Sequence, residues 1–261
     1  MIDLPMPRVR AEQPFRGLIA LALALAGTGI ACANPPGTLL ILQNQIPGLD
    51  STSNMCVFSA DSSDPSLASG RFDVDLDRAY PYFVYPLIQN ELPSIVAGGI
   101  ERNNVLLTSV RISIKAPAGV DPHWEAGCPG NFDVFRSVVL APGSTHAVQV
   151  EAFQSCHAQH LKQMIADGEI PADLSQPVFF TLGLTAIADR GGSEQKSGVF
   201  PFEVQVCAGC LQSMFPLTPA CADAPKPNPL HGNPCNFAQD GPAVLCCTTP
   251  AGALSCPAPD Q

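Results

Sequence analysis

Alternation of apolar and polar side chains dominates the chain between residues 38 and 206. The segment 200–206 places Phe, Phe, Val and Val at every second position, with Pro, Glu and Gln between them. The segment 177–188 repeats this pattern, and the polar segment 189–193 separates the two. A period of two is typical of a strand with one buried face. The two segments therefore predict an antiparallel hairpin.

The same alternation, bounded by turn residues, recurs along the chain. It predicts strands at 38–43, 55–58, 72–76, 82–85, 110–114, 132–140 and 145–153. Apolar residues at helical spacing after Ser155 predict a helix of about three turns that stops at Gly168, and a second short helical piece is expected at Leu87–Leu92. Short strands with few helices between them predict a mainly β fold, an immunoglobulin-like antiparallel β-sandwich with one or two short helices.

The composition changes at Cys207. Residues 207–261 contain seven Cys and ten Pro, with hardly any sustained apolar periodicity. A segment of this composition cannot build a core of ordinary size, so disulfides must hold it. We therefore predict a sandwich domain at 38–206 and a disulfide-stapled tail at 207–261, packed on the sandwich.

Cysteine usage indicates an oxidising compartment. An even number of cysteines follows Cys32, which fits five disulfides. Three of these ten cysteines precede residue 207 and seven lie at or after it. Both numbers are odd, so if all ten pair, at least one bridge must join the tail to the sandwich. The adjacent Cys246 and Cys247 are expected to take different partners. The ten are Cys56, Cys128, Cys156, Cys207, Cys210, Cys221, Cys235, Cys246, Cys247 and Cys256.

The charge balance argues against nucleic acid as a partner. Lys and Arg number 13 against 23 acids, a formal charge of −10, and only 14% of residues are charged. Phosphates require a basic face, which this composition does not supply. An acidic surface also repels anionic lipid head groups, so electrostatic adhesion to a membrane is not expected.

The amino terminus has the sequence features of an export signal. Three arginines (Arg8, Arg10 and Arg16) precede the uncharged, Leu- and Ala-rich run 17–31. Fifteen residues suit a signal peptide, whereas a membrane-spanning helix needs about 20. Residues 1–31 are therefore predicted to be a signal peptide.

The apolar run ends in Gly29-Ile30-Ala31-Cys32, which resembles the lipobox of bacterial lipoproteins. The resemblance implies lipidation of Cys32 and membrane association through that lipid, with 32–37 as a tether. Ala33 follows Cys32 where inner-membrane lipoproteins carry Asp, so the resemblance implies the outer membrane. The alternative is cleavage after Ala33, which would release a secreted or periplasmic soluble protein.

Cys207-Ala-Gly-Cys210 has the spacing of a redox motif, in which Cys207 would be the attacking thiolate. No βαβ unit surrounds it, so we favour structural disulfides. His157 and His160 are close enough on the predicted helix to share a metal, yet no third ligand is evident, and solvated or capping roles are favoured. Asp73, Asp75 and Asp77 superficially resemble a calcium loop, but their alternation favours an exposed, charged strand face.

The three tyrosines of the chain, Tyr80, Tyr82 and Tyr85, lie close together in sequence, and the single Trp124 lies in a predicted loop. These rings are candidates for a ligand platform, although strand packing is favoured for the tyrosines. No nucleophile elbow, HExxH helix, P-loop or dinucleotide fingerprint is present.

Beyond the lipobox, the mature sequence resembles surface lipoproteins of Gram-negative bacteria that combine a sandwich with a Cys-rich tail. We therefore expect a non-catalytic envelope module, structural or ligand-binding, with a protein or glycan ligand. No catalytic residue, metal or cofactor is predicted. The alternatives are an exported thiol–disulfide oxidoreductase that uses Cys207 and Cys210, or a secreted metal-binding module.

Overall fold

The computed structural model describes residues 38–50, 52–53, 55–76, 79–171, 177–212, 219–224, 235, 239–241 and 244–256. The chain divides into two units, 1–36 and 37–261. The predicted signal peptide (1–31), the lipidation residue Cys32 and the tether 32–37 lie outside the described residues. Within the described residues, no helix has both the length and the hydropathy needed to cross a membrane.

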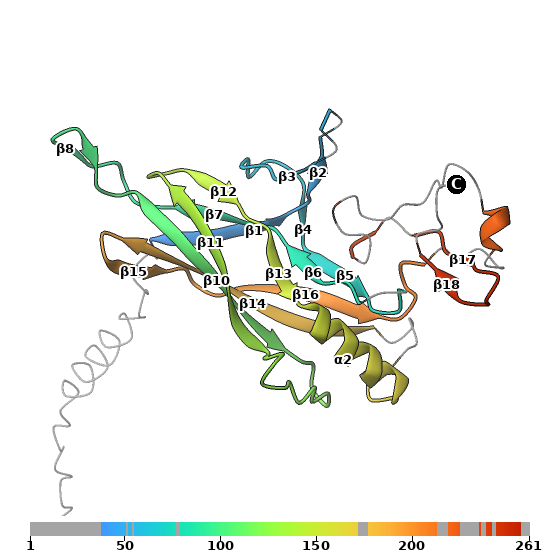
Figure 1. The fold of residues 1–261 in the computed structure, drawn as a ribbon. Coiled ribbons are helices and arrows are strands. Elements are labelled where there is room, and N and C mark those ends of the chain that lie inside the picture. The colour runs from blue at the N-terminus through green and yellow to red at the C-terminus, as the bar shows by residue number, and fades with distance from the viewer. Residues whose placement is uncertain are drawn as a thin grey trace, which may run out of the picture. The chain divides into compact units, whose positions relative to one another are not determined.

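Two main sheets form the second unit (Figure 1). The smaller has the strand order β12 (Thr145–Ala147), β7 (Pro86–Asn90), β1 (Leu39–Gln45) and β4 (Ser66–Leu67). The larger has the order β11 (Asn131–Leu140), β10 (Val105–Lys115), β14 (Val178–Arg190), β16 (Phe200–Cys207) and β5 (Ser69–Asp73), with β15 (Ser193–Lys196) paired to β14.

Smaller elements complete this unit. Two-stranded ladders join β13 (Val150–Phe153) to β6 (Tyr82–Val84), β2 (Gly48–Leu49) to β3 (Cys56–Val57), β8 (Val96–Ala97) to β9 (Ile100–Glu101), and β17 (Cys247–Thr248) to β18 (Leu254–Ser255). The helices described are α2 (Ser155–Ala166) and a 3₁₀ turn at Cys221–Asp223. The predicted fold class, a mainly β immunoglobulin-like sandwich with a stapled tail, is confirmed.

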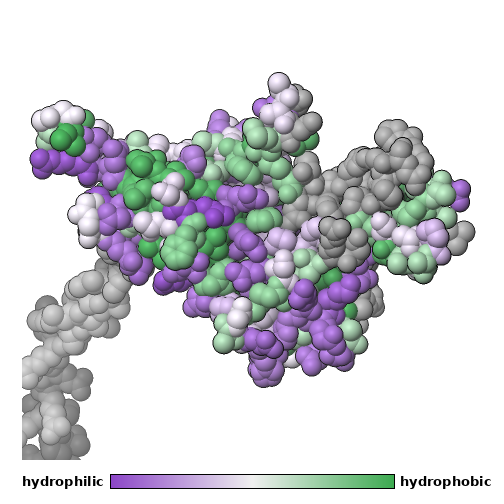
Figure 2. All heavy atoms as spheres, in the orientation of Figure 1, coloured by the Kyte–Doolittle hydropathy of each residue, from purple (hydrophilic) through white to green (hydrophobic). Residues whose placement is uncertain are grey.

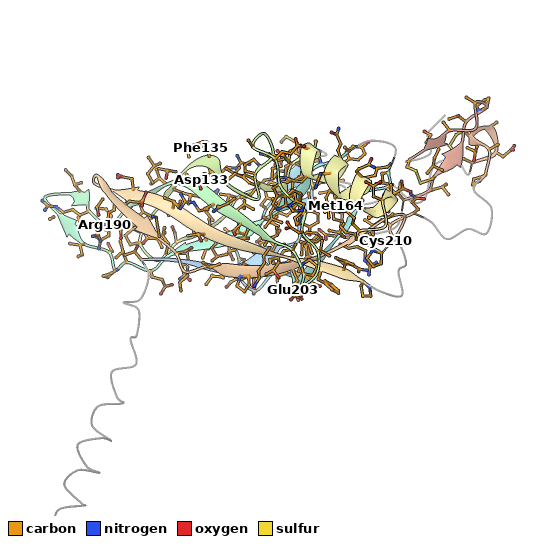
Figure 3. The ribbon with its side chains drawn as sticks, turned by 90° about the horizontal axis from the view of Figure 1, so that it is seen from below. Asp133, Phe135, Met164, Arg190, Glu203 and Cys210 are labelled. Carbon is orange, nitrogen blue, oxygen red and sulfur yellow. A yellow bond between two sulfur atoms is a disulfide. The ribbon has the colours of Figure 1, made fainter. Side chains whose placement is uncertain are left out.

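The core lies between the sheets, where the period-two alternation places it. Along β14, Phe180, Leu182 and Leu184 are fully buried, and they share one cluster with Leu39 and Ile88 of the smaller sheet. The predicted hairpin is present as an antiparallel pair of β14 and β16, with the short β15 between them in sequence. Arg190 and Cys210 lie toward opposite ends of the larger sheet (Figure 3).

The expected helical piece at Leu87–Leu92 is wrong. Residues 86–90 form β7, which is paired on both sides, with β12 and with β1. Consecutive residues of β7 are buried, because core packs against both of its faces. The segment 87–92, Leu-Ile-Gln-Asn-Glu-Leu, has too few apolar residues for its periodicity to distinguish helix from strand, and here the paired neighbours decide.

Helix α2 begins at Ser155, so Ser155 is its first residue and the N-cap is the residue before it. Gln154 is the N-cap, and it forms a capping box with His157, whose Nδ1 accepts the backbone N–H of Gln154 at 2.9 Å. At the other end Gly168 has φ +76°, a conformation that favours glycine and stops the helix. The helix buries His157, Ala158, Leu161 and Met164.

All ten cysteines after Cys32 are paired, and one bridge, Cys56–Cys235, links the sandwich to the tail across 179 residues of sequence. Cys246 and Cys247 take different partners, as their adjacency requires. The other bridges are Cys128–Cys156, Cys207–Cys210, Cys221–Cys247 and Cys246–Cys256.

Candidate functional site

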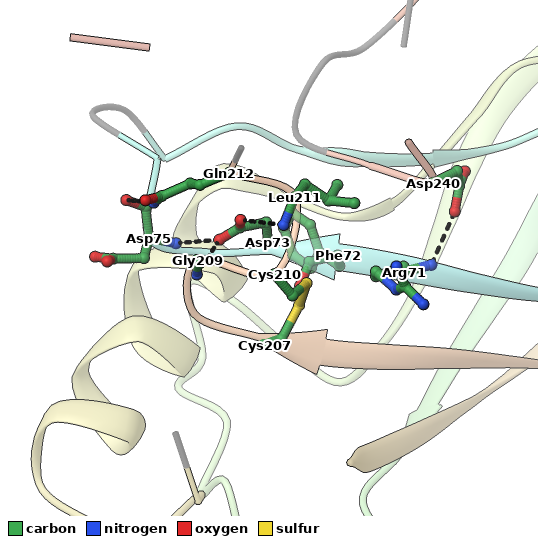
Figure 4. The surroundings of a disulfide bond; sticks show 10 residues. All are labelled: Arg71, Phe72, Asp73, Asp75, Cys207, Gly209, Cys210, Leu211, Gln212 and Asp240. Carbon is green, nitrogen blue, oxygen red and sulfur yellow. Dashed lines mark hydrogen bonds between the residues drawn. A yellow bond between two sulfur atoms is a disulfide. The ribbon is translucent and has the colours of Figure 1, made fainter. Parts of the chain in front are cut away.

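The Cys207–Cys210 bridge closes a tight corner where β16 ends (Figure 4). Cys207 is 3% exposed, whereas Cys210 is partly exposed. A reactive sulfur must be reachable by its partner. The assignment of Cys207 as the attacking thiolate is therefore wrong for this geometry, and Cys210 is the sulfur that an outside thiol would reach.

Asp73 lies beside this corner because β5 runs parallel to β16, with Asp73 opposite Cys207 in the register. Its carboxylate accepts the backbone N–H groups of Gly209 at 2.8 Å and Leu211 at 2.9 Å, which fixes the loop that carries Cys210. Burial raises the pKa of Asp73, although these hydrogen bonds oppose the shift. The side chain therefore anchors the loop from inside.

The predicted exposed strand face at Asp73, Asp75 and Asp77 is wrong at its first position. Asp73 is 1% exposed and β5 ends there. Asp75 is exposed and lies 3.0 Å from Lys162 Nζ of α2, while Asp77 lies outside the described residues. The cause is the buried backbone of the Cys207–Cys210 loop, whose N–H groups require an acceptor.

Two tail residues, Gln239 and Asp240, hold the tail onto the sandwich, and we call them the tail clasp. The buried Gln239 amide accepts the N–H of Phe83 at 2.7 Å and donates to its carbonyl at 2.8 Å, as a neighbouring strand would. Asp240 accepts the Arg71 N–H at 2.8 Å and the Tyr82 hydroxyl at 2.9 Å. The clasp thus covers the β5 edge of the larger sheet, a place where a sheet would otherwise expose unpaired backbone.

The candidate tyrosine platform is wrong. Tyr82 and Tyr85 are both fully buried, and Tyr80 is partly buried against the core. The Tyr82 ring packs on Phe72 with centroids 5.4 Å apart. Burial raises the pKa of Tyr85 to about 12. The rings of Tyr82 and Tyr85 fill the interior, so these two cannot serve as an exposed aromatic surface for a ligand.

His157 lies at the centre of an aromatic cluster at the start of α2. It is fully buried, stacks on Phe132 with centroids 5.5 Å apart and meets Trp124 edge-on at 4.9 Å. Nδ1 accepts the Gln154 N–H, so the imidazole is neutral, and Nε2 donates to the Pro129 carbonyl at 3.1 Å. His157 therefore ties the loop before β11 to the helix.

This arrangement does not suit a metal ion. The sulfur atoms of Cys128 and Cys156 approach His157 closely, yet they are bonded to each other, and both ring nitrogens of His157 are engaged. His160 directs Nε2 to the Pro122 carbonyl. The capping role that the sequence favoured is confirmed for His157, whereas a solvated role is wrong for it because its ring is fully buried.

Trp124 is the one candidate platform ring that borders a surface hollow. The hollow has a volume of about 280 Å³ and is also lined by Glu125, Gln159 and His160. The indole packs flat over the chain at Gly130, where a Cβ would lie 2.2 Å from it. Most of the ring's contacts are thus internal, with His157, His160 and the backbone.

The neutral, buried His157 predicts a pH-dependent stability. Burial lowers the pKa of His157 below its ordinary 6.5. As the pH falls, His157 of the unfolded chain therefore binds a proton before His157 of the folded chain does. The stability that the neutral His157 contributes is complete above pH 6.5, and it is lost as the pH falls from 6.5 through the lower pKa of the folded state. We expect the free energy of unfolding, measured with urea, to fall from pH 7 to pH 5 more steeply in the wild type than in His157→Gln.

Glutamine is the matched control because its amide can accept from Gln154 and donate to Pro129 without titrating. Subtracting the variant's profile also removes the buried acids Asp73 and Asp240, whose raised pKa values shift stability in the opposite direction. Identical pH profiles for the two proteins would contradict the assignment of a neutral imidazole.

A second surface hollow lies at the β2–β3 hairpin. It has a volume of about 420 Å³, and its exposed walls include Ile46 and Val57, which are 45% and 46% exposed. Leu49 and Met55 on the same hairpin are also exposed. We call this surface the apolar groove. Its lining is completed by Pro47, Gly48, Phe58, Ser59, Asp64 and Pro65.

The groove is held in place by the disulfide network. Cys56 begins β3, and its bridge to Cys235 fixes the hairpin to the tail, while the Phe58 ring stacks on the buried Tyr85 at 4.9 Å. The sequence predicted a strand at 55–58 but not this surface. The only sequence signal for this surface is the pair of apolar segments on either side of the polar residues 50–54. Such a pattern is too short to indicate a site.

No protein-family model matches the chain, and no curated protein matches it. Among solved structures, the chain is similar to the crystal structure of a protein from Archaeoglobus fulgidus. The identity is 14% and the TM-score 0.31, over 52% of this chain and 91% of that one. A likeness of this size carries no argument about function.

Proposed function

We propose that this protein is an exported envelope lipoprotein, anchored through a lipid on Cys32, that acts as a non-catalytic binding module of the outer membrane. The observation that carries the proposal is the pairing of all ten cysteines after Cys32. Disulfides of this number form and persist outside the reducing cytosol. Together with the lipobox-like sequence, they support an extracytoplasmic, lipid-anchored protein.

The position of the apolar groove supports a binding role. Strand β1 begins next to Thr38, the described residue nearest the tether, and the β2–β3 hairpin follows its other end. Seven residues of strand separate the two points by about 20 Å. A module tethered before Thr38 would present the groove away from its anchor. The exposed apolar walls suit apolar side chains of a protein partner.

Intact mass spectrometry of the protein extracted from native membranes tests the proposal. We expect a mass that starts at Cys32, includes acyl chains and lacks ten hydrogens relative to the reduced chain. A mature chain that begins after Ala33 would overturn the lipid anchor and leave a secreted protein. A chain with most of its thiols reduced would overturn export itself.

A thiol–disulfide oxidoreductase is the rival proposal. It is supported by the partly exposed Cys210 and by the Asp73 carboxylate, which fixes the loop that carries Cys210. In such an enzyme an outside thiolate attacks Cys210, forms a mixed disulfide and displaces the Cys207 thiolate. The same mass measurement discriminates. After mild reductant and alkylation, label confined to Cys207 and Cys210 would support the exchanger, whereas an unlabelled protein would support the binding module.

A further inference from the structure

The β8–β9 hairpin carries an apolar tip whose side chains are half or more exposed. Ile95, Val96 and Ile100 are 50%, 65% and 69% exposed, and the tip turns through Gly98 and Gly99. Both glycines have positive φ and open space around them. Figure 2 shows green apolar atoms beside pale and hydrophilic ones on this projecting hairpin.

The base of the hairpin is a fixed polar network. The Glu101 carboxylate accepts the Ser94 hydroxyl at 2.5 Å, the Asn103 N–H at 2.8 Å and the Ile95 N–H at 3.1 Å, and these hydrogen bonds, chiefly that of Ser94, lower the pKa of Glu101. The buried Asn90 at the end of β7 donates to the Asn103 carbonyl at 2.8 Å. The tip is therefore held in one orientation, which reduces the entropy lost when it docks.

The hairpin lies at the end of the sandwich from which the tether departs. Asn90 pairs with Leu39 at the start of β1, and the Glu91 N–H donates to the Thr38 carbonyl at 3.0 Å. Thr38 follows Cys32 by six residues, a distance of at most about 20 Å even when fully extended. A bilayer that holds a lipid on Cys32 is therefore within reach of the tip.

We propose that the β8–β9 hairpin is a bilayer-docking finger, whose apolar tip inserts among the phospholipids that hold the Cys32 lipid. This inference rests on the proposed lipid anchor. The attraction is apolar, because the protein carries a net charge of −10 and Glu91, Glu101 and Arg102 flank the hairpin with mixed sign. A lipid chain and an apolar insertion together form two attachment points, which hold a protein more firmly than one.

Two attachment points also orient the molecule. A single flexible tether leaves the sandwich able to rotate, whereas a docked finger fixes which end faces the membrane. The apolar groove follows the opposite end of β1, so docking would hold the groove toward the aqueous side. The finger thereby connects membrane attachment with presentation of the binding surface.

Fluorescence quenching in vesicles tests the finger. We would introduce Val96→Trp into the full-length precursor, purify the processed protein from membranes and reconstitute it in phosphatidylcholine vesicles with ordinary or brominated acyl chains. The matched control is Val57→Trp on the β2–β3 hairpin, which is also exposed but lies at the other end. The unsubstituted protein gives the background of Trp124.

We expect brominated chains to reduce the added emission of Val96→Trp by about twofold or more and to leave that of Val57→Trp unchanged. Both sites are exposed, so the circular dichroism spectra should match the wild type. Equal quenching of the two variants, or none for Val96→Trp, would overturn the finger. A blue-shifted but unquenched Val96→Trp emission would indicate a protein occupant, such as a second copy, and would overturn it as well.

The intact mass of the same samples separates the two proposals. Acylated Cys32 with an unquenched Val96→Trp leaves the lipoprotein proposal in place and removes the finger. A chain without acyl groups removes the lipid anchor, whatever the fluorescence shows, and with it the argument that places the bilayer next to the hairpin.

Discussion

Removal of the bridge between the sandwich and the tail, by Cys56→Ala with Cys235→Ala, is expected to lower the free energy of unfolding by about 3–5 kcal/mol. The bridge closes a loop of 179 residues, and the entropy it removes from the unfolded chain grows with the logarithm of loop length. Because the bridge also fixes β3, the variant should expose the apolar groove to limited proteolysis. Urea denaturation under non-reducing conditions measures the loss.

The matched control is Cys207→Ala with Cys210→Ala, which opens a loop with a sequence separation of only 3. The same reasoning gives a loss of about 1–2 kcal/mol for this pair. A loss equal to that of the Cys56–Cys235 variant would show that loop length does not govern the effect. Native mass of each variant confirms that the other four bridges have formed.

Gly70→Ala is expected to destabilise the protein by about 2–3 kcal/mol. A Cβ at position 70 would lie 1.8 Å from the Tyr82 hydroxyl and 3.1 Å from a carboxylate oxygen of Asp240. Tyr82 cannot move aside, since its fully buried ring packs on Phe72 and its hydroxyl donates to Asp240. Thermal and urea denaturation against the wild type measure the effect.

Two variants locate the cause of that loss. Gly127→Ala adds the same atom at an exposed glycine with nothing within 4 Å, so it should change stability by less than about 0.5 kcal/mol. Tyr82→Phe removes the clashing oxygen, and in the Gly70→Ala background it should cost less than it does alone. Strictly additive losses would contradict a clash between these two residues.

The sandwich could be predicted because its signals are local. Phe180 and Leu182 alternate with polar or small neighbours, and such alternation has one structural solution, a strand with one buried face. The segment Leu87–Leu92 was predicted to be helical because it lacks that alternation, since consecutive residues of β7 are buried. Only the neighbours β1 and β12, which are distant in sequence, identify it as a strand.

The candidate site depends on contacts that the sequence does not record. The Asp73 carboxylate binds backbone groups 136 and 138 residues away, and Gln239 completes β6 across 156 residues. Nothing near Asp73 or Gln239 indicates such a partner, so an acid in an alternating segment is reasonably expected to be exposed. The core packing favoured for the tyrosines is present, but the hydrogen bond from Tyr82 to the distant Asp240 has no local signal in the sequence.

The connectivity of the Cys56–Cys235 bridge constrains how the chain matures. In the exported protein that we propose, Cys56 would be the first of the ten paired cysteines to emerge from the membrane, and Cys235 would be the seventh. Oxidation in order of emergence would join Cys56 to Cys128, so the native pattern requires either delayed oxidation or later exchange of bridges. If oxidation follows the order of emergence, maturation is therefore expected to depend on a disulfide isomerase as well as an oxidase.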